Sequence, residues 1–221
     1  MKNHGNCESS KRRLIFLLVS LTLIAVSLAV GAGQPDEEIP RLAKILGWKA
    51  GDVIADVGAG EGQYAFAAHS YVGSKGKVYA TELDPKKLAA LKTEAGHRGW
   101  KNFEVLEAAE KETNLPVACC DAILLRRVYH HLTAPVEMDA SLYKSLKPSG
   151  VLVVIEFPPR ASLTASDPVK GVPANRGGHG IPQKILTEEL TAAGFVVDKI
   201  YNDWPDDDYC VLFRKAPPPA H

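Results

Sequence analysis

The hydrophobic pattern of the chain alternates between short apolar runs and longer segments with helical spacing. Seven runs have the length and composition of buried strands, at residues 53–57, 77–82, 102–106, 119–125, 151–157, 195–197 and 209–214. Segments with helical spacing lie between most of them, at residues 63–71, 86–96, 134–146 and 183–193, and a shorter one precedes the first run at 39–46. This alternation predicts an α/β fold built on a doubly wound parallel sheet.

The first strand ends in a glycine-rich turn that leads directly into a helix. The strand carries one acid, Asp56, and is followed by Gly58, Gly60 and Gly62. Glycines let the backbone turn sharply and approach a ligand closely, because they have no Cβ. The spacing is G-x-G-x-G rather than the dinucleotide G-x-G-x-x-G, since Gln63 follows the third glycine. The alternatives are a nucleotide-type pocket at the end of the first strand and a tight turn without a ligand.

The second predicted strand ends on Glu82, about 20 residues beyond the glycines. A carboxylate at this position can accept hydrogen bonds from the two neighbouring hydroxyls of a ribose. The alternative is a solvated acid just before the helix that starts at Asp84 and Pro85. The glycine turn upstream favours the ribose role.

Four further segments follow in an order that resembles the class I S-adenosylmethionine (SAM)-dependent methyltransferases. The run Asp56-x-Gly-x-Gly-x-Gly resembles the first motif of that family. Leu-Pro followed by Asp-Ala, within residues 115–122, resembles its fourth motif, and Leu-Lys-Pro-Ser-Gly-Val-Leu at 146–152 resembles its fifth. Val-Tyr-His-His-Leu at 128–132 and the Gly-His to Gly-Phe stretch at 178–195 are similar to segments of its small-molecule members.

The resemblance implies a Rossmann-like doubly wound sheet of seven strands, with the last strand antiparallel and helices on both faces. It implies SAM as cofactor and a cofactor-binding set made of Asp56, Gly58, Ala59, Gly60, Gly62, Glu82, Leu83, Glu110, Leu125 and Arg126. The backbone of Leu125 and Arg126 is expected along the methionine part of SAM. The Gly-Asp pair that the family places after the third strand is absent, and Glu110 is the expected substitute beside the adenine.

Methyl transfer from a sulfonium is an in-line displacement, so the protein mainly aligns the nucleophile, the methyl carbon and the sulfur. A general base helps when the nucleophile carries a proton. The candidates are Tyr129, His130 and His179, although the adjacent pair His130 and His131 cannot both face one pocket. The segment 160–180 is glycine-rich and poor in apolar residues, which predicts a loop over the acceptor site.

The net charge and the cysteines limit the kinds of partner that we expect for the domain. The formal net charge is +0, so no overall field attracts nucleic acid, and we expect a small-molecule methyl acceptor. The four cysteines show no zinc-like spacing, and we expect no metal. Two rival functions are a non-catalytic, membrane-tethered SAM-binding domain and a nicotinamide-dependent oxidoreductase on the same fold. The sequence does not indicate an oligomeric state.

The N-terminal region predicts a signal peptide or a transmembrane anchor. A basic flank, residues 1–13, precedes the uncharged stretch 14–33, and about 20 such residues can cross a bilayer as a helix. Small residues at 30–32 also offer a cleavage site for a signal peptidase. We therefore expect a membrane-anchored or exported protein, with the side of the membrane open because SAM is mainly cytoplasmic. The remaining parts are a linker and N-terminal helix at 34–51, the methyltransferase-like domain at 52–215 and a disordered tail at 216–221.

Overall fold

The computed structural model describes residues 35–159, 171–176 and 179–217. The predicted leader or anchor, much of the predicted acceptor loop and the end of the predicted tail lie outside these residues. Within the described ranges, none of the helices is both long and apolar enough to cross a membrane.

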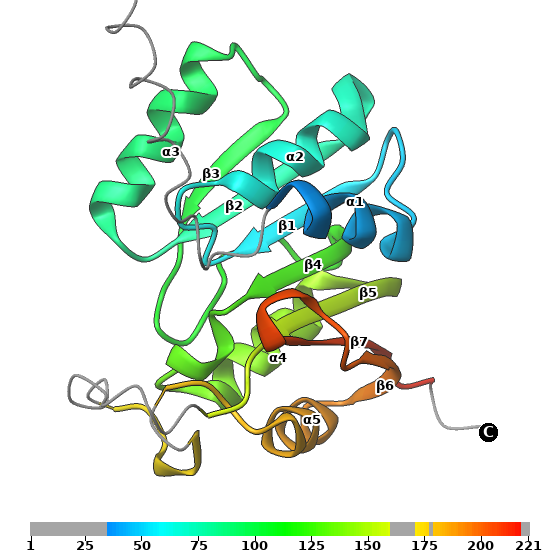
Figure 1. The fold of residues 1–221 in the computed structure, drawn as a ribbon. Helices are drawn as coiled ribbons and strands as arrows, with labels where there is room; N and C mark the ends of the chain where they lie inside the picture. Colours follow the sequence, from blue (N-terminus) through cyan, green and yellow to red (C-terminus); the bar gives the residue numbers. More distant parts are fainter. Residues whose placement is uncertain (1–34, 160–170, 177–178, 218–221) are drawn as a thin grey trace, which may run out of the picture. The chain divides into compact units, whose positions relative to one another are not determined.

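A seven-stranded sheet forms the centre of the domain, in the order β3-β2-β1-β4-β5-β7-β6 (Figure 1). The strands are β1 (Val53–Val57), β2 (Lys77–Glu82), β3 (Phe103–Glu107), β4 (Cys120–Arg126), β5 (Leu146–Glu156), β6 (Phe195–Tyr201) and β7 (Tyr209–Lys215). Strands β1 to β5 pair in parallel, and β7 runs antiparallel between β5 and β6. This confirms the predicted Rossmann-like sheet with an antiparallel last strand.

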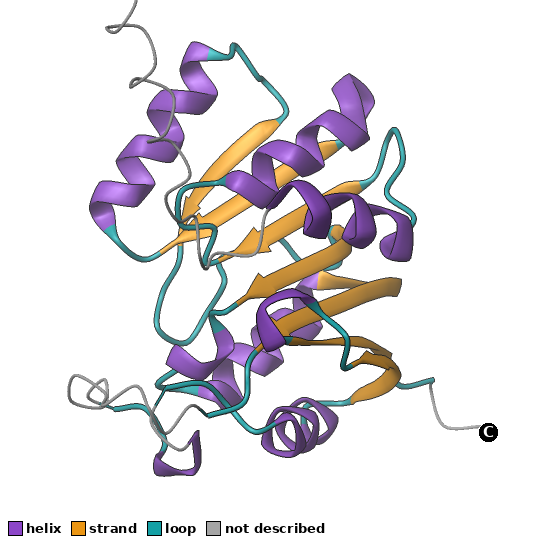
Figure 2. Ribbon diagram, in the orientation of Figure 1, coloured by secondary structure: helices purple, strands orange, loops and turns teal. Residues whose placement is uncertain are grey.

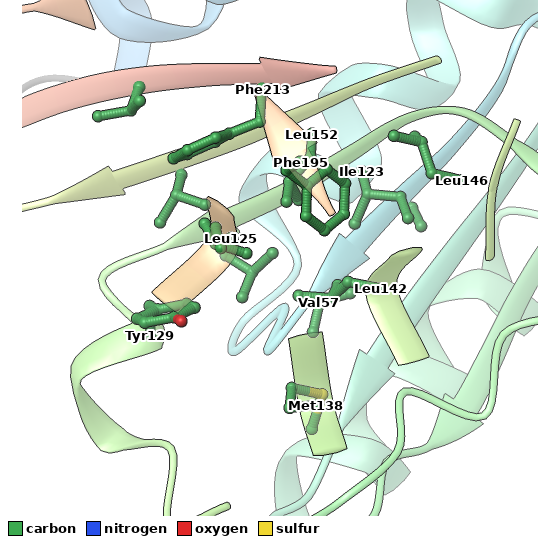
Figure 3. Close-up of a cluster of buried hydrophobic side chains, with 14 of the residues drawn as sticks. Val57, Ile123, Leu125, Tyr129, Met138, Leu142, Leu146, Leu152, Phe195 and Phe213 are labelled. Carbon is green, nitrogen blue, oxygen red and sulfur yellow. The ribbon is translucent and has the colours of Figure 1, made fainter. Parts of the chain in front are cut away.

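Helices cover both faces of the sheet, as predicted (Figure 2). One layer holds α1 (Pro35–Leu46), α2 (Gln63–Val72) and α3 (Pro85–His97), and the other holds α4 (Pro135–Ser145) and α5 (Gln183–Ala192). Each layer closes its own apolar core: Leu42 and Leu91 pack on the first face, whereas Leu142 and Phe195 pack on the second (Figure 3). The helices thus bury both faces of the central strands, whose near-continuous apolar sequence requires such cover.

The strand order reverses direction at β1, which lies between β2 and β4. Because β1, β2, β4 and β5 are parallel, their carboxyl ends meet at one edge of the sheet. In open α/β sheets a ligand binds outside this edge, at the point where the strand order switches. The predicted site residues follow these strand ends.

Three details differ from the sequence prediction. Helix α1 begins at Pro35 rather than 39, since Pro35 at a first helical position costs no hydrogen bond and the next residues are acidic. Strand β5 begins at Leu146, the last residue of the predicted helix, rather than at Val151, because Leu146 pairs with Cys120 in β4. Within the predicted helix 134–146, Leu142 is buried but Val136, also apolar, is 77% exposed.

Candidate active site

The glycine loop after β1 contacts β2 and the residue Val128 beyond β4, and one of its glycines borders free space. Gly58, Gly60 and Gly62 all have positive φ angles, of 74°, 56° and 84°. The N–H groups of Gly58 and Ala59 both donate to the carbonyl oxygen of Thr81 at 2.9 Å. A Cβ on Gly58 would lie 2.6 Å from Cγ2 of Val128, whereas a Cβ on Gly60 would have no neighbour within 4 Å. The loop is therefore fixed against β2 and the end of β4, and Gly60 borders free space.

Asp56 binds the first turn of the helix that follows the glycine loop. Its Oδ2 accepts a hydrogen bond from the N–H of Ala65 at 3.0 Å, in the first turn of α2. The N-cap residue of this helix is Gly62, which has no side chain to cap it. Burial raises the pKa of Asp56 to about 7, and the Ala65 N–H lowers it in part. The contact shows Asp56 positioning the helix, while its contact with a cofactor stays a prediction.

Glu82 lies at the tip of β2 against the glycine loop. Oε2 accepts from the N–H of Gly60 at 2.8 Å, and Oε1 accepts from those of Leu83 and Asp84 at 2.7 and 2.9 Å. A carboxylate offers about four lone-pair sites, so Oε2 keeps acceptor capacity beside the open side of Gly60. The side chain of Leu83 follows directly and is 56% exposed, a large apolar surface next to this carboxylate.

The carboxyl end of β4 carries Leu125 and Arg126, which the sequence placed along the cofactor. Leu125 is fully buried. The guanidinium of Arg126 pairs with Glu38 of α1, with Nε–Oε1 at 3.1 Å and Nη2–Oε2 at 2.9 Å. The side chain of Arg126 is therefore committed to α1. This arrangement is compatible with the predicted cofactor contact, which involved the backbone alone.

Glu38 is the centre of a buried network that the sequence analysis missed. It is fully buried and also accepts hydrogen bonds from the Tyr64 hydroxyl at 2.7 Å and from Nε1 of Trp204 at 2.8 Å. Burial works to raise the pKa of Glu38, but the bonds from Arg126, Trp204 and Tyr64 outweigh it, and the net pKa is lowered. The partners come from α2, the end of β4 and the β6–β7 connection, so no local sequence pattern announces them.

Arg127, which follows Arg126 at the end of β4, forms a second link to the β6–β7 connection. It holds a left-handed conformation with φ 54°, which is costly for a residue with a side chain. Its guanidinium bonds to Asp208 at 2.7 Å and to Asp206 at 3.2 Å, on the β6–β7 connection.

Glu110, the expected adenine neighbour, is an exposed residue in the loop after β3.

Tyr129 lies in the core on the α4–α5 face (Figure 3). Its side chain is 0% exposed, and its hydroxyl is 2.8 Å from Oδ2 of Asp139 and 3.1 Å from Oε2 of Glu189. Burial raises its pKa well above the ordinary value. The structure therefore buries this predicted base, and its hydroxyl lies between two carboxylates.

His130 and His179 are brought together, with their ring centroids 5.0 Å apart. Nδ1 of His130 is 2.8 Å from Oε2 of Glu156, the last residue of β5, and its Nε2 is buried without a hydrogen-bond partner. The ring of His131 lies 3.8 Å from that of His130. Burial lowers the pKa of His131, and His130 and His179 lower it further. Within the described part of the chain, no three His, Cys, Asp or Glu residues are placed to hold a metal ion.

The fold and this site define a class of protein, and comparisons with known proteins agree. Residues 55–154 match the family described as a methyltransferase domain. Among solved structures, a SAM-dependent methyltransferase from Aquifex aeolicus superposes with a TM-score of 0.66 at 25% identity, over 82% of this chain and 89% of that one. The chain is therefore similar to SAM-dependent methyltransferases over residues 55–154 and in its fold, and this likeness implies S-adenosyl-L-methionine as the cofactor.

Two curated relatives match shorter stretches. A ubiquinone/menaquinone biosynthesis C-methyltransferase from Francisella philomiragia is 30% identical over 50% of this chain and 45% of its own length. The chloroplastic 2-phytyl-1,4-beta-naphthoquinone methyltransferase of Arabidopsis thaliana is 28% identical over 67% of this chain and 58% of its own length. The chain thus spans about half the length of these relatives.

The described residues fit this cofactor. Gly60 leaves free space where a Cβ would stand, and Glu82 keeps acceptor capacity beside that space. Leu83 adds an exposed apolar side chain on which a flat ring can pack. A ribose and an adenine need such an acceptor and such a surface next to each other.

Proposed function

We propose that the chain is a SAM-dependent methyltransferase whose acceptor is a small molecule. When bound, SAM supplies a methyl group made electrophilic by the sulfonium it is attached to. Glu82 carries the proposal: three backbone N–H groups hold its carboxylate at the loop, ready for ribose hydroxyls. The remaining cofactor contacts proposed are the loop from Gly58 to Gly62, Leu83, Glu110 and the backbone of Leu125 and Arg126.

The proposed acceptor class has two supports. The net charge of +0 gives the chain no general attraction for nucleic acid. Two of the relatives are named for methyl transfer in quinone biosynthesis or to a naphthoquinone. A small cyclic acceptor is consistent with both facts.

The location of the protein is part of the proposal. We propose that residues 14–33 act as a leader or an anchor, as their charge-free sequence after a basic flank suggests. Fractionation of cells that express the full chain tests this, together with N-terminal sequencing of the product. Recovery of the intact chain from the soluble fraction would contradict it.

The cofactor proposal is tested by calorimetry with SAM and with NADH on wild type and two variants. In Gly60→Arg a bulky side chain fills the free space, and we expect at least tenfold weaker SAM binding, about 1.4 kcal/mol. Gly99→Arg is the matched control, because Gly99 also has a positive φ, 65°, with no neighbour within 4 Å. Unchanged SAM affinity in Gly60→Arg, or NADH binding in preference to SAM, would overturn the proposal.

Catalysis needs a separate measurement, because the rival without turnover also binds SAM. We expect transfer of a labelled methyl group from SAM into a small-molecule fraction of a cell extract. Transfer that is lost in Gly60→Arg and kept in Gly99→Arg supports the enzyme. Binding of SAM without any transfer favours the non-catalytic domain.

A further inference from the structure

Two neighbouring cysteines lie at the amino end of β4, the end opposite the proposed cofactor site. Cys119 is half-buried just before the strand, and Cys120, the first residue of the strand, is fully buried. Both side chains are free thiols. Neither residue takes part in the proposed methyl transfer, so this pair offers a separate chemistry.

The two thiols contact each other and differ in acidity. A hydrogen bond from the S–H of Cys120 to the sulfur of Cys119 lowers the pKa of Cys119. Partial burial opposes this effect, and the ammonium groups of Lys147 and Lys77 add to it, so the net pKa of Cys119 is lowered. The same hydrogen bond, together with burial, raises the pKa of Cys120. Cys119 therefore ionises first, beside a thiol that keeps its proton.

Lys147 is held beside this pair by the residue that follows it. The Nζ of Lys147 lies 2.7 Å from Oδ2 of Asp121, and the two side chains are 34% and 35% exposed. Asp121 is itself fixed, because the same oxygen accepts the N–H of Val53 at 2.9 Å. A partly exposed thiol near such a cation is typical of reactive cysteines, since the thiolate is the nucleophile.

The backbone at this end of β4 has few ladder partners. Cys120 pairs with Leu146 of β5, and the register of these two strands shifts between Cys120 and Ala122. Pairing of β4 with β1 begins at Ala122. Such an irregularity interrupts the ladder and lets a strand bend locally. The peptide between the two cysteines can therefore change its geometry while the central part of β4 stays paired.

We propose that Cys119 is a site of oxidation by hydroperoxides, and that Cys120 is the resolving thiol that converts the product into a disulfide. Redox-sensitive cysteines are commonly accessible, easily ionised thiols placed next to a second cysteine. The proposal is independent of the proposed methyltransferase function, because neither cysteine lies at the cofactor edge of the sheet.

The reaction balances with the hydroperoxide as the oxidant. The Cys119 thiolate attacks the terminal peroxide oxygen, the O–O bond breaks, and the sulfur becomes a sulfenic acid. The other oxygen leaves as water or an alcohol after taking up the proton that Cys119 released. The sulfur of Cys120 then attacks that of Cys119, so the S–S bond forms, the S–O bond breaks, and water leaves with the proton of Cys120. The two thiols lose two electrons, which the peroxide gains.

A disulfide between consecutive residues is strained. Their Cα atoms are about 3.8 Å apart, which is below the range of about 4.4–6.8 Å in ordinary disulfides. Strain makes such a bond easier to reduce. The modification at Cys119 and Cys120 is therefore reversible by a dithiol.

The first test treats the full chain with hydrogen peroxide, alkylates the remaining thiols and digests the product with trypsin. The tryptic peptide of residues 112–126 contains Cys119 and Cys120 and no other cysteine. We expect mass spectrometry to show the loss of two hydrogens from this peptide, and dithiothreitol to restore both thiols. A peptide that keeps two alkylatable thiols, or that carries a sulfinic acid on Cys119 beside a free Cys120, would overturn the proposal.

The second test separates the roles of the two thiols. In Cys120→Ala, the sulfenic acid on Cys119 has no resolving partner, and we expect dimedone, which traps sulfenic acids, to label it. In Cys119→Ala, we expect peroxide to oxidise Cys120 at least about tenfold more slowly than in wild type, because a buried thiol with a raised pKa is inert. The control Cys210→Ala removes another fully buried thiol and is expected to react as wild type. Equal oxidation of Cys120 with and without Cys119 would overturn the assigned roles.

Discussion

The two halves of the sheet's carboxyl edge differ in how their polar side chains are hydrogen-bonded. Around β1 and β2 the carboxylate of Glu82 has three backbone donors. Around β4 and β5, Arg126, Arg127 and Glu156 are bonded as well, but several polar atoms there and in the helices that pack on these strands are buried without partners. Of the five such side-chain atoms in the described part of the chain, three belong to this side (His130 Nε2, Asp139 Oδ1 and Arg176 Nε) and two to the other (Trp48 Nε1 and Thr81 Oγ1). The half proposed to hold the cofactor is thus the one whose strand-end carboxylate is held by backbone donors alone.

The largest expected effect comes from breaking a fully satisfied group, Glu38. In Glu38→Ala the guanidinium of Arg126 stays half-buried without its carboxylate, and we expect a loss of about 3–5 kcal/mol in the free energy of unfolding. Urea denaturation measures this. Glu37→Ala is the control, because Glu37 is an exposed neighbour on the same helix. Equal losses in both variants would show that the network adds nothing.

The next effect concerns affinity rather than stability. Glu82→Gln replaces one acceptor oxygen with an N–H₂ group, which meets N–H donors already present. We expect SAM to bind about 10- to 100-fold more weakly, about 1.4–2.7 kcal/mol. Calorimetry measures this, with Glu107→Gln as the control, since Glu107 pairs with Glu82 in the adjacent strand and is exposed. Similar affinities in the two variants would remove the contrast between the halves.

A smaller effect concerns Asp139, on the β4–β5 side, and is measured as the pH dependence of the free energy of unfolding. Burial raises the pKa of Asp139 to about 7, although the Tyr129 hydroxyl lowers it in part. The folded state therefore binds this proton more tightly than the unfolded state, and stability falls as the pH rises from about 4 to about 7. Asp139→Asn removes the ionisation, and we expect it to gain about 1–2 kcal/mol relative to wild type at about pH 8 compared with about pH 4.

Urea denaturation at the two pH values measures the gain in Asp139→Asn. Asp198→Asn, at an exposed aspartate in β6, is the control and is expected to show no such change. A pH dependence in Asp139→Asn equal to that of wild type would mean that folding does not raise the pKa of Asp139.

The smallest effect concerns Leu83. Truncation in Leu83→Ala removes part of an exposed apolar surface beside Glu82, and we expect about three- to fivefold weaker SAM binding, about 0.7–1 kcal/mol. Calorimetry with SAM measures it. Val136→Ala, at a side chain that is 77% exposed, is expected to leave affinity unchanged. An affinity for Leu83→Ala equal to wild type would exclude a contact with the adenine.

The site features that the sequence predicted involve residues close together along the chain, whereas those that it missed involve residues far apart. The glycine loop and Glu82 follow from spacing within about 30 residues, and the structure places them together. Tyr129 was expected at the pocket, but one 3-10 turn directs it into the α4–α5 core and places His130 on Glu156. The partners of Glu38 come from three distant elements, and only the finished sheet brings them within reach.

The bond between Glu38 and Arg126 also sets where the domain can be shortened from its N-terminal side. A truncated protein that starts at Arg41 would remove the first half of α1 and leave the end of β4 with an unpaired cation. A version that keeps Pro35 retains the whole helix and its carboxylate. For fusion and expression work, the practical boundary of the domain therefore lies at or before residue 35, ahead of the first strand by a full helix.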